Sequence, residues 1–225
     1  MPGWLHALAV ASLVLGVACA GIMVVLTSAR PPKMTVMRFV WPLCALFGGP
    51  LLIAFYLRYA WKGGDIPFAA SVAKGTLHCG AGCALADLFA ENLAHVFPGV
   101  LPVFGLGWLF GHEIFATWAM DYVFALATGI VFQYFAIAPM RDLSFREGMV
   151  SAAKADVLSL TSWQVGMYGL MGIAHFVIFK RVLNTPVDAG DALFWFAMQG
   201  AMLAGFLTAY GPNWLLIRSG IKERM

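Results

Sequence analysis

The sequence predicts an all-α integral membrane protein, a polytopic helical bundle with about seven transmembrane helices. Of its 225 residues, 61% are hydrophobic and only 11% are charged, whereas a soluble domain carries roughly 25% charged residues. The mean hydropathy is +0.82. A chain of this composition is typical of a protein embedded in a lipid bilayer, so we expect residues 1–225 to form a single transmembrane domain.

Seven apolar segments are each long enough to cross a hydrocarbon core of roughly 30 Å. They are residues 4–27, 39–60, 75–97, 99–118, 120–139, 158–179 and 192–216. The fourth and fifth segments are joined without a clear loop. An alternative there is a short half-helix that ends at Gly111, with His112 opening a longer helix. Mixed charges and apolar spacing in residues 140–157 predict a short helix on the cytoplasmic membrane surface.

Lys and Arg residues in the short loops predict the orientation, because cytoplasmic loops are enriched in them. If the N-terminus lies outside, nine fall on the cytoplasmic side: Arg30, Lys33, Arg38, Arg141, Arg146, Lys154, Arg218, Lys222 and Arg224. Five fall outside: Arg58, Lys62, Lys74, Lys180 and Arg181. This count predicts an N-out/C-in orientation. The net charge of +3 is small and scattered, which argues against nucleic acid as a partner.

The third segment carries a stripe of polar side chains that a membrane helix should not tolerate. The stripe repeats every fourth residue, a spacing that places side chains above one another on a helix. Its members are Cys79, Cys83, Asp87, Glu91 and His95, with His78 beside its start. Ionisable groups at membrane depth usually face a bundle interior or a watery path. Small residues (Gly75, Gly80, Gly82, Ala86 and Ala90) would let neighbouring helices approach closely.

His78, Cys79 and Cys83 form a candidate metal site, since thiolate and imidazole ligands suit Cu(I) and Zn(II). Cysteines four apart on a straight helix are poorly placed for a disulfide, which needs Cβ atoms about 3.5–4.5 Å apart. The spacing favours metal capture over redox cycling, with small-residue packing as the alternative. We expect Cys19 and Cys44 to be apolar packing residues.

Methionines recur at the same helical spacing, as Met167 with Met171 and Met198 with Met202. Thioethers bind Cu(I) without deprotonation, so these pairs could relay an ion, although filling gaps in a core is their more common role.

Further polar residues extend a candidate proton or ion path. Glu113 and Asp121 are expected near the outer turn, with His112 and close to the thiols, where helix capping is the alternative. Lys154, Asp156 and Gln164 open the sixth segment and are expected to form an inner vestibule with Glu91 and His95. An interfacial helix start with its caps is again the alternative.

The chain resembles a bacterial membrane-protein family catalogued as domain of unknown function 4396. The resemblance rests on three stretches: HCGAGC, the run from FQYFAIAPMRDLSF to SWQVGMYGLM, and FWFAMQGAMLAGFLTAYGPNWLLIRSGIKERM. It covers roughly residues 70–225. The family pattern corresponds here to His78, Cys79, Gly82, Cys83 and Asp87, and to Lys154, Asp156 and Gln164. The resemblance implies a shared membrane fold and these residues of interest, and it implies no activity.

Three functional hypotheses follow. The first is a transporter or metal-handling protein for a soft cation, best fitted by Cu(I) and otherwise by zinc. The second is a membrane oxidoreductase that uses the dithiol or a haem, although no Cys-x-x-Cys-His attachment motif occurs. The third is a non-catalytic subunit or assembly factor, in a homo-oligomer or a larger membrane complex. The residues favour a role other than that of an enzyme.

Overall fold

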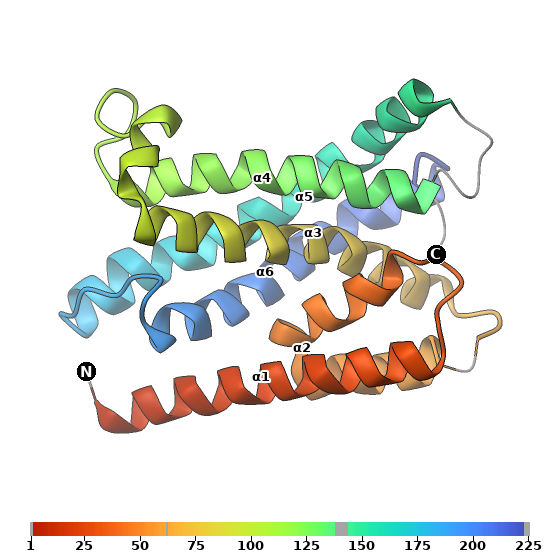
Figure 1. Ribbon diagram of the computed structural model, residues 1–225, viewed down its shortest axis with the longest axis horizontal. Coiled ribbons are helices and arrows are strands. Elements are labelled where there is room, and N and C mark those ends of the chain that lie inside the picture. The colour runs from red at the N-terminus through yellow and green to blue at the C-terminus, as the bar shows by residue number, and fades with distance from the viewer. Residues whose placement is uncertain (1, 62, 138–143, 223–225) are drawn as a thin grey trace.

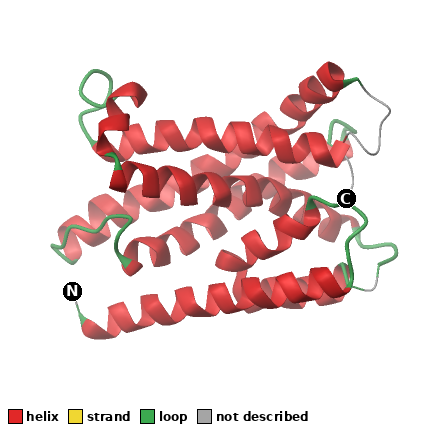
Figure 2. Ribbon diagram, viewed as in Figure 1, coloured by secondary structure: helices red, strands yellow, loops and turns green. Residues whose placement is uncertain are grey.

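The protein is described by a computed structural model over residues 2–61, 63–137 and 144–222. Figure 2 shows that helices dominate these ranges. In chain order the elements are α1 (Gly3–Ala29), α2 (Met37–Tyr59), α3 (Phe68–Val96), the 3-10 helix η1 (Pro98–Phe104), α4 (Glu113–Ile137), α5 (Phe145–Ile173), the π-helix η2 (Ala174–Val182) and α6 (Ala192–Arg218). The all-α prediction is confirmed. Lys62, Arg141 and Arg224, which the charge count uses, lie outside the described residues.

The long helices lie side by side as a bundle, and the two ends of the chain lie at opposite ends of it (Figure 1). Five helices are long and apolar enough to cross a membrane: Gly3–Ala29, Met37–Tyr59, Glu113–Phe135, Phe145–Val182 and Ala192–Arg218. Apolar side chains on α1 point outwards, with Val14 62% and Val25 67% exposed, as lipid-facing residues should be. The protein is therefore a multi-pass membrane protein.

The predicted fourth span, residues 99–118, is wrong. This segment forms η1 and an irregular turn, and α4 begins only at Glu113. Pro98 and Pro102 lack the N–H groups that a helix interior needs, and Gly105 and Gly107 have φ values of 104° and 87°. The alternative in which a longer helix opens at His112 is close to the observed start of α4.

The predicted surface helix in residues 140–157 is not a separate element in its described part. The Ser144 side chain accepts a hydrogen bond from the Glu147 N–H, while the Glu147 carboxylate accepts one from the Ser144 N–H at 3.1 Å. This capping box starts α5. From there α5 and η2 continue over 38 residues, so the predicted span 158–179 lies inside a longer helix.

Helix α2 is a hairpin rather than a straight rod. Gly49 interrupts it with φ 52° and ψ −140°, and Pro50 follows. The ring centroids of Trp41 and Tyr56 lie 5.0 Å apart, although the same residues in a straight α-helix would be about 22 Å apart along the axis. The two halves of α2 therefore fold against each other. The first half begins, and the second half ends, at the same end of the bundle (Figure 1). The predicted span 39–60 is helical but re-entrant.

Helix α3 is the central helix of the bundle. It packs against α2, α4, α5 and α6. Its small residues permit the close approach that the sequence predicts. A Cβ added to Gly82 would lie 3.2 Å from the Gly129 Cα of α4, and one added to Gly75 would lie 3.2 Å from the Ile217 side chain of α6. The polar stripe of α3 is thus enclosed by protein rather than lipid.

Candidate functional site

The polar stripe of α3 is buried over most of its length. Its buried members, each no more than 8% exposed, are His78, Cys79, Cys83, Asp87 and Glu91. Each step of four residues turns a side chain by about 40° around an α-helix, so the four steps from Cys79 to His95 amount to about 160°. The His95 side chain is accordingly 42% exposed, and its Nδ1 lies 3.4 Å from Asp188 Oδ1. The buried stripe therefore ends at Glu91.

Carboxyl groups from α3 and α4 form what we call the acidic cluster (Asp87, Glu91 and Asp121). Asp121 Oδ2 accepts hydrogen bonds from Tyr168 Oη at 2.7 Å and from Gln164 Nε2 at 3.2 Å, both on α5. The Asp87 carboxyl group faces that of Asp121. Among the described residues, however, neither Asp87 oxygen has a partner at hydrogen-bond distance.

In the part of the chain that the structure describes, no cationic side chain forms a salt bridge with the acidic cluster. Within the described part of the chain, the single salt bridge is the exposed one between His95 and Asp188. Buried carboxylates are costly unless they are paired, protonated or bound to a metal ion. The cluster is therefore built to hold protons or a cation.

A second group, which we call the lysine cluster (Asp156, Ser159, Asn213 and Lys222), lies nearer the start of α3. Lys222 is 1% exposed, and its Nζ donates hydrogen bonds to Asn213 Oδ1 at 2.7 Å and to Ser159 Oγ at 3.4 Å. Asp156 is fully buried and lies within electrostatic range of Lys222. Its carboxyl group occupies space that exists because Gly129 of α4 has no side chain.

The thiols of Cys79 and Cys83 connect the two clusters. They interact with each other, and Cys79 also interacts with the Asp156 carboxyl group. Cys83 lies within electrostatic range of Asp87 and Asp121. A continuous series of buried acids and thiols therefore runs along α3. We call it the polar column.

His78 does not converge with the two thiols on one point. Its ring packs edge-on against Phe132, with ring centroids 6.1 Å apart, and its Nε2 is buried without a hydrogen-bond partner in the described residues. In the described parts of the chain, no three His, Cys, Asp or Glu side chains are arranged as a ready metal site. Metal binding by His78, Cys79 and Cys83 stays a prediction.

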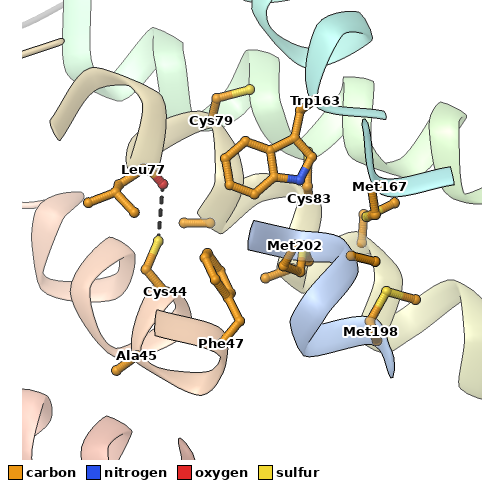
Figure 3. Packing of buried hydrophobic residues seen from close by; sticks show 14 of the residues in the cluster. Cys44, Ala45, Phe47, Leu77, Cys79, Cys83, Trp163, Met167, Met198 and Met202 are labelled. Atoms are coloured by element: carbon orange, nitrogen blue, oxygen red, sulfur yellow. Dashed lines mark hydrogen bonds between the residues drawn. The ribbon is translucent and has the colours of Figure 1, made fainter. Parts of the chain in front are cut away.

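Four methionines belong to the apolar cluster that contains the two thiols. Met167, Met171, Met198 and Met202 are all buried, in the same apolar cluster as Cys79 and Cys83. Figure 3 shows three of these methionines beside Trp163, on the side facing α6. It also shows the Cys44 thiol donating to the Leu77 carbonyl oxygen at 3.1 Å. Cys19 and Cys44 are buried and free, which fits packing roles.

Other predicted site residues lie away from the column. Glu113 and Lys154 are exposed, and His112 packs against Phe115 and Phe176 rather than near the thiols. The expected vestibule of Glu91 and His95 with the start of α5 does not form as one group in the described residues. Gln164 joins the acidic cluster through its hydrogen bond to Asp121, but His95 and Asp156 lie apart from it. Helices α3 and α5 run in the same direction (Figure 1), so Asp156 lies beside Cys79 while His95 lies at the other end of α3.

Three residues of the site have no signal in the sequence. Tyr168 is one helix turn beyond Gln164 and resembles any aromatic residue of a membrane helix. Asn213 and Lys222 reach the column only because α6 returns along α5 and the chain turns at Gly220, where φ is 73°. A charge-based interpretation places Lys222 in a solvated tail.

Comparison with known proteins places both clusters in a single matched region. A family model described as "Domain of unknown function (DUF4396)" matches residues 70–222. The chain belongs to the DUF4396 family. The DUF4396 region contains the whole polar column and ends at Lys222, whereas α1 and the α2 hairpin precede it. No curated protein and no solved structure shows significant similarity to the chain.

Proposed function

We propose that this DUF4396 protein transports, or otherwise handles, a soft cation in the membrane, and that Cu(I) is the ion its ligands suit best. The observation that carries the proposal is the polar column, in which buried acids and thiols lie together with no acid in a salt bridge among the described residues. Lys222 lies near Asp156 at one end of the column, but the acidic cluster needs positive charge that a metal ion or protons would supply.

The ion is captured by Cys79 and Cys83, and His78 Nε2 becomes a further ligand when its ring turns from Phe132 toward the thiols. Cu(I) binding displaces thiol protons, and the neighbouring carboxyl groups of Asp87 and Asp156 receive them. The methionines then offer ligands that need no deprotonation. Support comes from the position of the four buried methionines beside the thiols, and from the unpaired Nε2 atom of His78.

We further propose that the protein lies in a bacterial inner membrane with its N-terminus outside and its C-terminus in the cytoplasm. The α2 hairpin supports this orientation, because the chain enters and leaves α2 on the cytoplasmic side. Arg58, Lys62 and Lys74 then join the cytoplasmic side, and the count of Lys and Arg changes from nine against five to twelve against two. Only Lys180 and Arg181 are left outside, which agrees with the positive-inside rule.

The metal content of purified protein tests the proposal. Cu(I) and Zn(II) are supplied separately under reducing conditions, and the bound metal is measured for the wild type, Cys79→Ser and Cys83→Ser. We expect each variant to lose most of its bound metal, and the wild type to bind less as the pH falls, because protons compete for the thiolates. Cys19→Ser is the matched control, since its buried thiol is on α1, which packs mainly against α2 and α6.

Uptake of the same ion into proteoliposomes tests the role of the acidic cluster. Asp87→Leu should abolish uptake while raising thermal stability, because it removes a buried carboxyl group that has no partner. Equal metal content in the wild type and Cys79→Ser would remove the basis of the proposal. A scaffold role would then replace it, and a haem spectrum would point to an oxidoreductase instead.

A further inference from the structure

A large cavity lies apart from the thiols, at the end of the bundle where both halves of the α2 hairpin meet the end of α1. Its volume is about 970 Å³, which is large enough for an organic ligand. The wall is formed by the chain on either side of the hairpin, by Lys74 at the start of α3, and by Phe132 and Phe135 of α4. We call it the hairpin pocket.

The hairpin pocket is positively charged. Arg30, Lys33 and Lys74 line it, and its described lining contains no Asp or Glu. None of the three cations forms a salt bridge with a described residue. Lys33 and Lys74 lie near enough to repel each other, and Lys74 is partly buried. Like charges held together without a counter-ion are unfavourable, so the pocket favours an anion.

Aromatic and apolar side chains complete the pocket. Trp41 and Tyr56 form its inner wall, and the Arg30 guanidinium lies 5.7 Å from the centroid of the Trp61 ring. Phe39 and Phe135 line it and are 62% and 58% exposed. A ligand in this pocket would therefore meet cations together with apolar side chains that are exposed on the surface.

We propose that the hairpin pocket binds a phosphate group, which Arg30, Lys33 and Lys74 hold. Arg and Lys are the side chains that bind phosphate best, through charge-assisted hydrogen bonds. The phosphate comes either from the headgroup of an anionic phospholipid or from a soluble phosphate compound. The exposed apolar rim favours the lipid, because an acyl chain can lie along Phe39 and Phe135 while the headgroup enters the pocket.

Native mass spectrometry of the full-length protein tests this site. The protein is purified in zwitterionic detergent and titrated with phosphatidylglycerol or, in parallel, phosphatidylcholine of the same chain length. We expect phosphatidylglycerol to bind preferentially. Lys33→Gln and Lys74→Gln should each weaken its binding by about fivefold. Lys33 is exposed, so its substitution should leave the fold intact. Lys180→Gln, at the opposite end of the bundle, is the matched control.

Competition with inorganic phosphate separates the two sources. If millimolar phosphate displaces the lipid, the ligand is a soluble phosphate compound, and if the lipid stays bound, the ligand is the phospholipid. Equal binding of the two lipids by the wild type, or unchanged phosphatidylglycerol binding by Lys33→Gln and Lys74→Gln, would overturn the proposal. Neither result depends on metal binding at the thiols.

Discussion

Trp163 is the side chain around which α3, α5 and α6 pack. It is fully buried, and the edge of its ring meets Phe47 of the α2 hairpin, with ring centroids 5.9 Å apart. Its ring fits because Gly80 and Gly205 have no side chains: a Cβ at Gly80 would overlap the ring, and one at Gly205 would lie 2.7 Å from its Nε1. These glycines thus set the distance between the helices around the polar column.

A single methyl group at Gly80 should therefore disturb the packing. We expect Gly80→Ala to lower the free energy of unfolding by about 1–3 kcal/mol, because a buried indole cannot move aside as a flexible chain can. Thermal unfolding in detergent measures the change. Gly169→Ala is the control, since no atom lies within 4 Å of a Cβ added there. Equal melting temperatures for the two variants would contradict this account of Trp163.

At the level of single residues, the sequence predicts the buried stripe of α3 but not all of its partners. Cys79, Cys83, Asp87 and Glu91 are recognisable because their spacing follows the helix period. Asp121 and Gln164 are recognisable as polar groups within apolar segments. Lys222 and Asn213 are not, because they meet Ser159 from 63 and 54 residues away. Helical periodicity carries no information about contacts at such separations.

Among the elements, the α2 hairpin depends on one side chain of α6. Breaking a helix inside a membrane frees carbonyl groups that must find other partners. Gln199 Nε2 donates to the Leu46 carbonyl oxygen at 2.6 Å, near the turn of the hairpin, and Gln199 Oε1 accepts from Ser12 Oγ of α1 at 2.7 Å. Gln199 thus joins α1, α2 and α6.

Two glutamines in long apolar helices offer a comparison. Gln199→Met should destabilise the protein by about 1–3 kcal/mol, because it leaves the Leu46 carbonyl group without its partner. Gln133→Met should be neutral or stabilising, because both polar atoms of Gln133 are buried without a partner in the described residues. Thermal unfolding of the two variants side by side measures the difference. Greater damage from Gln133→Met would mean that the amide of Gln199 does not hold the hairpin.

Hydropathy predicts which segments are apolar but not how each one folds. It locates α1 and α6 to within two residues and starts α4 seven residues late, yet it counts η1 as a span and α2 as a crossing. In both cases the decisive residues are Pro and Gly: Pro98 and Pro102 in η1, and Gly49 and Pro50 in α2. Such residues allow a break without requiring one, so the contact between Trp41 and Tyr56 is needed to show the reversal.

For the whole molecule, the hairpin brings both ends of α2 to one end of the bundle, which the proposed orientation places in the cytoplasm. Arg38 and Arg58 lie near the two ends of α2 and are both exposed. A membrane-impermeant maleimide should label Arg38→Cys and Arg58→Cys from the cytoplasmic side only, and Lys180→Cys from the outside only. The four native cysteines are buried, which keeps the background low. Labelling of Arg38→Cys and Arg58→Cys from opposite sides would show that α2 crosses the membrane.

The DUF4396 region begins and ends at neighbouring points in space. At its start, the Ala69 carbonyl oxygen accepts a hydrogen bond from Tyr210 Oη at 3.1 Å, and the Phe68 ring packs edge-on against Trp214, with centroids 4.8 Å apart. Four alternating helices thus close on themselves, as in domains that tolerate insertion and circular permutation. Segments that precede or follow this region in a chain can therefore both attach at the same end of the bundle. Such attachments leave the orientation of its four helices unchanged.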